Sequence, residues 1–184
     1  QRLVRTASIT GDEAKVVQLV ADFRRNLGLA VQIVEAEPNR PNVIARWDRG
    51  LPGPSLLLND HVDIVPPGPL ENWSHPPFAA EIANGRIYGR GTIDTKSGLT
   101  TILMATRAAR EVGLPICGQL TLVFSCDEEV GGAKGMQFLC RNGYIKADMA
   151  VVAEPTTMQV EIATKGRLNL EITTRGVATH GARP

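Results

Sequence analysis

One histidine and five acidic residues in this sequence could do chemistry together: His61, Asp63, Asp94, Glu128, Glu129 and Glu154. Divalent metals of hard to borderline character bind carboxylate oxygen and imidazole nitrogen. Two such ions held close together need several of these ligands and a carboxylate that bridges them. We therefore predict a metal site with four ligands: His61, Asp94, Glu129 and Glu154.

The acidic run in "SCDEEVGG" places three like charges, Asp127, Glu128 and Glu129, directly after an apolar segment. Like charges repel, and their burial is costly unless an opposite charge compensates them. Bound metal cations would compensate this cluster. Glu128, if it stays free of the metal, could take a proton from water and act as a general base. Gly131 and Gly132 allow the tight turn that this arrangement needs.

Each of these features has an ordinary alternative when it is taken alone. His61 with Asp63 could be a core histidine whose hydrogen bonds are satisfied. Glu128 and Glu129 could begin a helix, because acidic residues favour its first turn. Asp94 could cap the helix that follows it. Their joint occurrence at strand ends favours a functional site over these alternatives.

The elements that must position these residues follow from the hydrophobic pattern. A period of 3.6 predicts helices over 11–29, 96–114 and 133–143. Apolar or alternating runs predict strands over 30–36, 42–47, 54–60, 118–127 and 147–154, and further strands within 158–176. Strands separated by helices indicate a layered α/β domain with a mostly parallel sheet. The carboxyl ends of such strands form the ligand site, and three of them precede His61, Glu128 and Glu154.

The composition excludes several classes of function. The 184 residues are 43% hydrophobic and 21% charged, as in ordinary globular proteins, and the net charge is +1. With 4% aromatic residues and no basic block, we expect no nucleic-acid partner. No apolar run is long enough for a membrane span and no secretory signal is visible, so we expect no membrane partner. Three cysteines without a paired pattern suit a reducing, cytoplasmic location.

Five ordered motifs carry a resemblance to a known family: "NDHVDIVPPG", "YGRGTIDTKSG", "SCDEEVGG", "VAEPT" and "KGRLNLEITTRGVATHGARP". The sequence resembles the dinuclear zinc deacylases and peptidases, the family of acetylornithine deacetylase, succinyl-diaminopimelate desuccinylase, aminoacylase and glutamate carboxypeptidase. The spacing agrees as well, because 33 residues separate His61 from Asp94 and 34 separate Asp94 from Glu128. The resemblance covers the chain from about residue 10 to its end.

The resemblance implies a role for each site residue. His61 and Glu154 would hold one Zn²⁺, Asp94 would bridge two Zn²⁺, and Glu129 would hold the other; Co²⁺ or Mn²⁺ could replace zinc. Glu128 would be the general base, and Asp63 would orient His61 by accepting its second ring N–H. His180 would reach the active site of a partner subunit in a homodimer and stabilise an oxyanion.

The implied activity is hydrolysis of a small N-acyl amino acid, of the deacetylase or desuccinylase type. Glu154 favours this reading over the alternative, a dipeptidase or carboxypeptidase of the same family. The implied domains are a catalytic portion over 1–165 and the start of a lid and dimerisation domain over 166–184. The family's last histidine ligand has no counterpart, so an inactive fragment is a further alternative. Asp60, Thr95 and Ser97 depart from the residues usual in the family.

Overall fold

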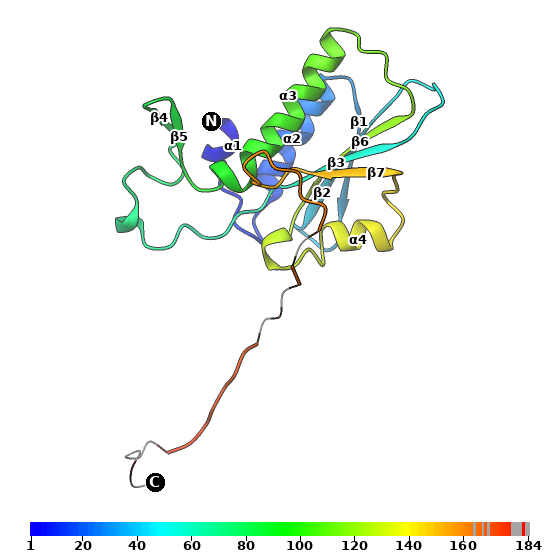
Figure 1. The fold of residues 1–184 in the computed structure, drawn as a ribbon. Coiled ribbons are helices and arrows are strands. Elements are labelled where there is room, and N and C mark those ends of the chain that lie inside the picture. The colour runs from blue at the N-terminus through cyan, green and yellow to red at the C-terminus, as the bar shows by residue number, and fades with distance from the viewer. Residues whose placement is uncertain (164, 167, 169, 178–181, 183–184) are drawn as a thin grey trace.

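The computed structural model describes residues 1–163, 165–166, 168, 170–177 and 182. Its helices are α1 (Arg2–Arg5), α2 (Ala14–Asn26), α3 (Ser97–Glu111) and α4 (Met136–Arg141). The described residues form a five-stranded sheet of β1 (Ala30–Glu35), β2 (Pro41–Asp48), β3 (Leu56–His61), β6 (Gln119–Ser125) and β7 (Met149–Val152). A separate hairpin pairs β4 (Glu81–Ala83) with β5 (Arg86–Tyr88) (Figure 1).

The strand order β1-β2-β6-β3-β7 divides the sheet into two halves. β1, β2 and β6 pair antiparallel, whereas β6, β3 and β7 pair parallel. The register sets His61 opposite Ser125 and Asn59 opposite Val152. The carboxyl ends of the three parallel strands therefore meet at one edge, which is where a sheet of this kind binds ligands.

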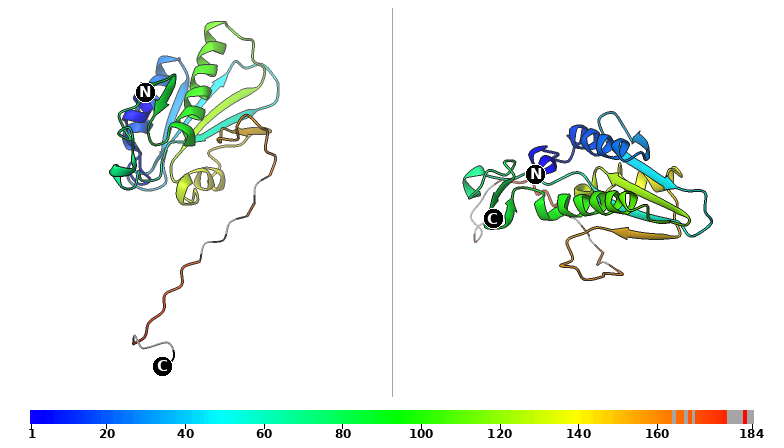
Figure 2. Two further views of the ribbon diagram at one scale, coloured as in Figure 1. Left: turned by 60° about the vertical axis from the view of Figure 1, so that its left-hand side comes forward. Right: turned by 90° about the horizontal axis from the view of Figure 1, so that it is seen from above.

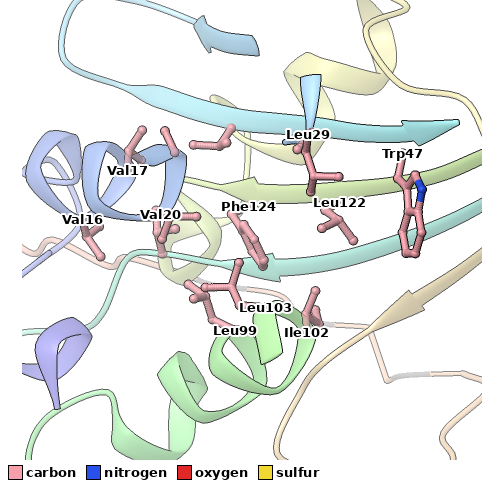
Figure 3. Close-up of a cluster of buried hydrophobic side chains, with 14 residues drawn as sticks. Val16, Val17, Val20, Leu29, Trp47, Leu99, Ile102, Leu103, Leu122 and Phe124 are labelled. Carbon is pink, nitrogen blue, oxygen red and sulfur yellow. The ribbon is translucent and has the colours of Figure 1, made fainter. Parts of the chain in front are cut away.

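Helices cover both faces of the sheet, with α2 and α3 on one face and α4 on the other (Figures 1 and 2). The core under α2 and α3 contains Val16, Val20, Leu99 and Phe124 among its buried residues (Figure 3). The alternation of β6 feeds both cores, because Phe124 faces the α2–α3 side while its neighbour Val123 packs with the α4 cluster. The acidic turn that follows β6 thus begins from a strand buried on both faces.

The sequence predictions of the fold class, the three helices and the strands up to residue 154 are confirmed. The prediction of strands within 158–176 is wrong for the described residues of that range, none of which is in a strand. A strand needs a hydrogen-bonded neighbour, and here Val160 and Ile162 are 91% and 97% exposed. The domain boundary at residue 165 stays a prediction. Among the described residues, no helix is long and apolar enough to cross a membrane.

Candidate metal centre

His61, Asp94 and Glu129 converge at the carboxyl edge of the parallel strands. Each offers a ligand atom, and these atoms all lie within 4.8 Å of one another. The Nε2 atom of His61 is 3.0 Å from Oδ1 of Asp94 and 3.8 Å from Oε2 of Glu128. His61 is buried, whereas the Asp94 and Glu128 side chains are about half exposed, at 54% and 52%. The cluster therefore has a fixed inner nitrogen and carboxylates that face outward.

Asp63 ties the end of β3 to the acidic turn. Its carboxylate is buried and accepts hydrogen bonds from the backbone N–H of Glu128 at 3.1 Å and of Glu129 at 3.2 Å. The Thr10 hydroxyl donates a third bond, at 2.8 Å. The nearest partner of His61 Nδ1 is the main-chain oxygen of Asp63 at 2.9 Å, while the carboxylate lies at 3.5 Å. Asp63 thus contacts the His61 ring mainly through its backbone and uses its carboxylate to hold the glutamate turn.

Asp127 points away from the cluster, and the prediction that metal cations compensate all three acids of this run is wrong for it. Its buried carboxylate forms an ion pair with Arg40 and accepts a 3.0 Å bond from the Lys134 N–H. Arg40 also pairs with the buried Glu13 at 3.1 Å. A positive backbone φ of 72° at Asp127 turns the chain so that its side chain and that of Glu128 diverge. The guanidinium of Arg40, and not a metal ion, therefore compensates the charge of Asp127.

Asp94 lies on a kinked turn, Thr92–Lys96, directly before α3. The Asp94–Thr95 peptide is cis. The buried Thr95 hydroxyl donates to Oδ1 of Asp60, and the same oxygen accepts the His61 N–H at 2.8 Å. The Lys96 ammonium donates to the main-chain oxygens of residues 3 and 6, at 2.9 and 2.8 Å. Buried polar contacts of the two residues that follow Asp94 hold this turn in place.

The electrostatics of the cluster favour a cation. Burial would lower the pKa of His61, but Asp63, Asp60 and Glu128 outweigh it and raise the pKa to about 10. Burial, followed by Asp94 and other neighbouring carboxylates, raises the pKa of Glu129 above its usual range. Burial likewise raises the pKa of Asp60 to about 8. A raised pKa means that the charged form of a carboxylate is disfavoured where it stands. A nearby cation would stabilise that charged form.

The donor set fits a divalent metal ion. One imidazole nitrogen and two carboxylates within 4.8 Å provide the ligand types that zinc binds. Glu154 lies outside this close group, but it lines a cavity of about 370 Å³ together with His61 and Glu128. Burial, with Glu128 and Asp94, raises the pKa of Glu154. The structure brings five of the predicted site residues to the cluster with Glu154 at its edge, while His180 lies outside the described residues.

Several residues that shape the site were not predicted to do so: Thr10, Glu13, Arg40 and Thr95. Arg40 lies in the turn between β1 and β2, far from the motifs in sequence, and only the folded contacts connect it with Asp127. For Asp127 a signal was available, because it comes shortly after the apolar run of β6. An acid buried at such a place requires a buried cation as its partner. No comparable signal identified Thr10, whose hydroxyl contact spans 53 residues.

A family model describes this chain. Residues 57–180 match the model of peptidase family M20/M25/M40. This match covers the histidine, both glutamates of the acidic turn, and the strand that precedes Glu154.

Relatives and solved structures agree with that match. Succinyl-diaminopimelate desuccinylase from Paracoccus denitrificans is 34% identical over 193 residues, covering 100% of this chain and 50% of the relative. An M20 family metallo-carboxypeptidase from Sulfolobus solfataricus has a TM-score of 0.73 at 23% identity, over 83% of this chain and 35% of that chain. A tripeptidase from Staphylococcus aureus has a TM-score of 0.66 at 26% identity, over 83% and 41%. The chain spans about half the length of the curated relatives that it matches.

Proposed function

Because the chain belongs to peptidase family M20/M25/M40, we propose that this protein is a metal-dependent amidohydrolase that removes the acyl group from a small N-acyl amino acid. The relatives that align with the whole chain are named succinyl-diaminopimelate desuccinylase, which supports an acyl-amino acid substrate. The observation that carries the proposal is the close group of His61, Asp94 and Glu129 with Glu128 beside it.

The metal would be held by His61, Asp94, Glu129 and Glu154, and two zinc ions are the proposed content. Bound zinc supplies Lewis acidity, which polarises a carbonyl oxygen and lowers the pKa of water. The group at 4.8 Å supports three of these ligands directly. Glu154 shares the adjoining cavity with His61, which supports its assignment as a further ligand.

Glu128 is the proposed general base. Its carboxylate is about half exposed, lies 3.8 Å from His61, and accepts no hydrogen bond within the described part of the chain. It is therefore free to take a proton from the attacking water and return it to the leaving amine. The backbone of Glu128 is fixed by the Asp63 carboxylate, so the base is held at a constant place while its side chain faces the cavity.

The surroundings of the enzyme are also part of the proposal. A cytoplasmic location is supported by three free cysteines, which suit a reducing compartment. A homodimer, with His180 of one subunit serving the other, rests on the family resemblance. We propose it together with a catalytic portion over 1–165 that leads into a lid domain.

The test of this function is a hydrolysis assay. Because the chain spans about half the length of its relatives, the full-length protein is used. N-succinyl-diaminopimelate and N-acetyl amino acids are expected to release their amines, and Glu128→Gln is expected to lower kcat by about 10²- to 10⁴-fold with its zinc content kept. No hydrolysis of any acyl amino acid by the zinc-loaded protein would reject the proposal.

A second candidate function is peptide hydrolysis. It is favoured by the solved structures of similar fold, which include a metallo-carboxypeptidase and a tripeptidase. In a peptide substrate the acyl group on the scissile nitrogen is an aminoacyl or peptidyl group, whereas in the first candidate it is a simple acyl group such as succinyl or acetyl. Faster turnover of dipeptides or tripeptides than of acyl amino acids would favour this second function.

A further inference from the structure

We propose that Asp60 is a positioning residue of the metal centre, and that one of its carboxylate oxygens clamps together the two segments that carry His61 and Asp94. The inference rests on the proposed function, because it concerns the same ligands. Asp60 is the next-to-last residue of β3, directly before His61, and its side chain is fully buried. It forms no ion pair among the described residues, so it is not neutralised in the way that Asp127 is.

The clamp consists of two hydrogen bonds to one atom. Oδ1 of Asp60 accepts the His61 N–H at 2.8 Å and the hydroxyl of Thr95, which follows Asp94 directly. The first bond fixes the backbone at one ligand, and the second fixes the backbone next to the other. The two ligands are 33 residues apart in sequence, yet their side chains meet at 3.0 Å.

The residues packed around Asp60 hold its carboxylate in a single orientation. Its Oδ2 atom has no hydrogen-bond partner in the described structure and lies 2.7 Å from the place that a Cβ at Gly98 would occupy. The first turn of α3 can approach this closely because residue 98 has no side chain. Packing against α3 therefore directs Oδ1 toward His61 and Thr95.

Asp60 has a structural counterpart in Asp63. Asp63 ties the His61 segment to the turn that carries Glu128 and Glu129, whereas Asp60 ties the same segment to the Asp94 turn. Both aspartates are buried, and neither belongs to the close group of ligand atoms. Loss of the Asp60 clamp should therefore loosen the spacing of His61 and Asp94 without removing a ligand, which weakens metal binding.

The experiment is a titration of the metal-free chain with Co²⁺, followed by the visible absorption of the bound ion, with thermal unfolding of each metal-free variant alongside. Thr95→Val removes the hydroxyl but keeps the shape, and Thr95→Ser restores a hydroxyl. Asp60→Ala removes the acceptor, and Asp60→Asn keeps one oxygen acceptor. Thr106→Val is the matched control, because Thr106 is also buried and bonds only within α3, to the oxygen of residue 102.

We expect Thr95→Val and Asp60→Ala each to weaken Co²⁺ binding about 10- to 100-fold. The double variant, with both Thr95→Val and Asp60→Ala, should bind Co²⁺ no more weakly than the single variant with the lower affinity. The reason is that the two changes break the same contact. Thr95→Ser, Asp60→Asn and Thr106→Val should bind Co²⁺ nearly as wild type does.

Two results would overturn the clamp alone. One is a lowered unfolding temperature with unchanged Co²⁺ affinity, which would mean a merely structural contact. The other is equal weakening by Thr95→Ser and Thr95→Val. If wild type and Asp94→Asn bind Co²⁺ alike, the metal centre itself is wrong and the clamp is rejected with it.

Discussion

Four acidic residues near His61 form two groups with opposite surroundings, an inner pair, Asp63 and Asp127, and an outer pair, Glu129 and Glu154. Asp63 and Asp127 are buried, and protein hydrogen-bond donors or a cation surround their carboxylates. Glu129 is half-buried and Glu154 exposed, and no hydrogen bond or ion pair reaches either carboxylate within the residues that the structure describes. The inner acids are already satisfied by the protein, whereas the outer acids repel one another.

This difference separates positioning from binding. A buried carboxylate that already accepts protein donors is closed off from a ligand and serves to hold backbone segments together. An outer carboxylate without donors is available to a metal ion or a substrate. Neighbours in sequence can fall on opposite sides of this division, as Asp127 and Glu128 do, so the role of each acid follows from its partners.

The largest expected effect is on stability at the inner acids. Asp127→Ala leaves the buried Arg40 without one of its two partners, and removal of one member of a buried ion pair costs about 3–5 kcal/mol. Urea unfolding of the metal-free chain measures the loss. Glu154→Gln is the matched outer variant, with an expected change within about 0.5 kcal/mol. Equal losses in the two variants would remove the distinction between the groups.

The converse effect is expected for metal affinity at the outer acids. Glu129→Gln removes a member of the close ligand group and should weaken Co²⁺ binding by more than about 100-fold, beyond the effect of changing a ligand's hydrogen-bond partner. Its unfolding free energy should not fall, because relief of charge repulsion offsets any lost contact. Unchanged Co²⁺ affinity in isothermal titration would exclude Glu129 from the site.

A smaller effect is expected at Thr10, which donates to the inner acid Asp63. Thr10→Val should cost about 1.5–3 kcal/mol at neutral pH, the usual contribution of a hydrogen bond to a charged group. The matched control is Thr101→Val, since the Thr101 hydroxyl is exposed and bonds only within α3. Urea unfolding of both variants compares the two positions.

The cost of Thr10→Val should also depend on pH. Burial would raise the pKa of Asp63, but His61, Thr10 and other donors outweigh it and lower the pKa. The stability from a lowered carboxyl pKa is present above the unfolded value of about 3.9 and is lost as the pH falls through the folded value. The difference between wild type and Thr10→Val should therefore shrink in acid. A constant difference down to pH 2 would contradict this account of Asp63.

The smallest effect concerns thiol chemistry beneath the acidic turn. Burial raises the pKa of Cys126 to about 12, whereas Cys117 and Cys140 are exposed. A thiol-specific reagent at pH 8 should react with two thiols in the folded chain and with a third only after unfolding, because the thiolate is the reactive form. Rapid reaction of all three would show that the scaffold under the turn opens readily.

The local motifs are sufficient to predict which residues meet at this edge of the sheet, although their role as ligands stays a prediction. Residue type at strand ends and at a helix start singles out His61, Asp94 and Glu129, and the structure brings their side chains together. The inner contacts could not be read in this way, because Arg40 meets Asp127 across 87 residues of sequence. The alternating segment over 158–176 shows the opposite limit. Its pattern suits a strand, yet the described residues there have no strand partner.

The measurement that tests the central claim most directly is the zinc content of the purified chain and of Asp94→Asn, by equilibrium dialysis with elemental analysis. The claim is that the outer carboxylates and His61 hold a metal ion while the inner ones hold the fold. The account predicts two zinc ions per chain in the wild type and their loss in Asp94→Asn. The metal-free forms of the two proteins should unfold at the same temperature. Equal zinc in both proteins, or none in the wild type, would contradict it.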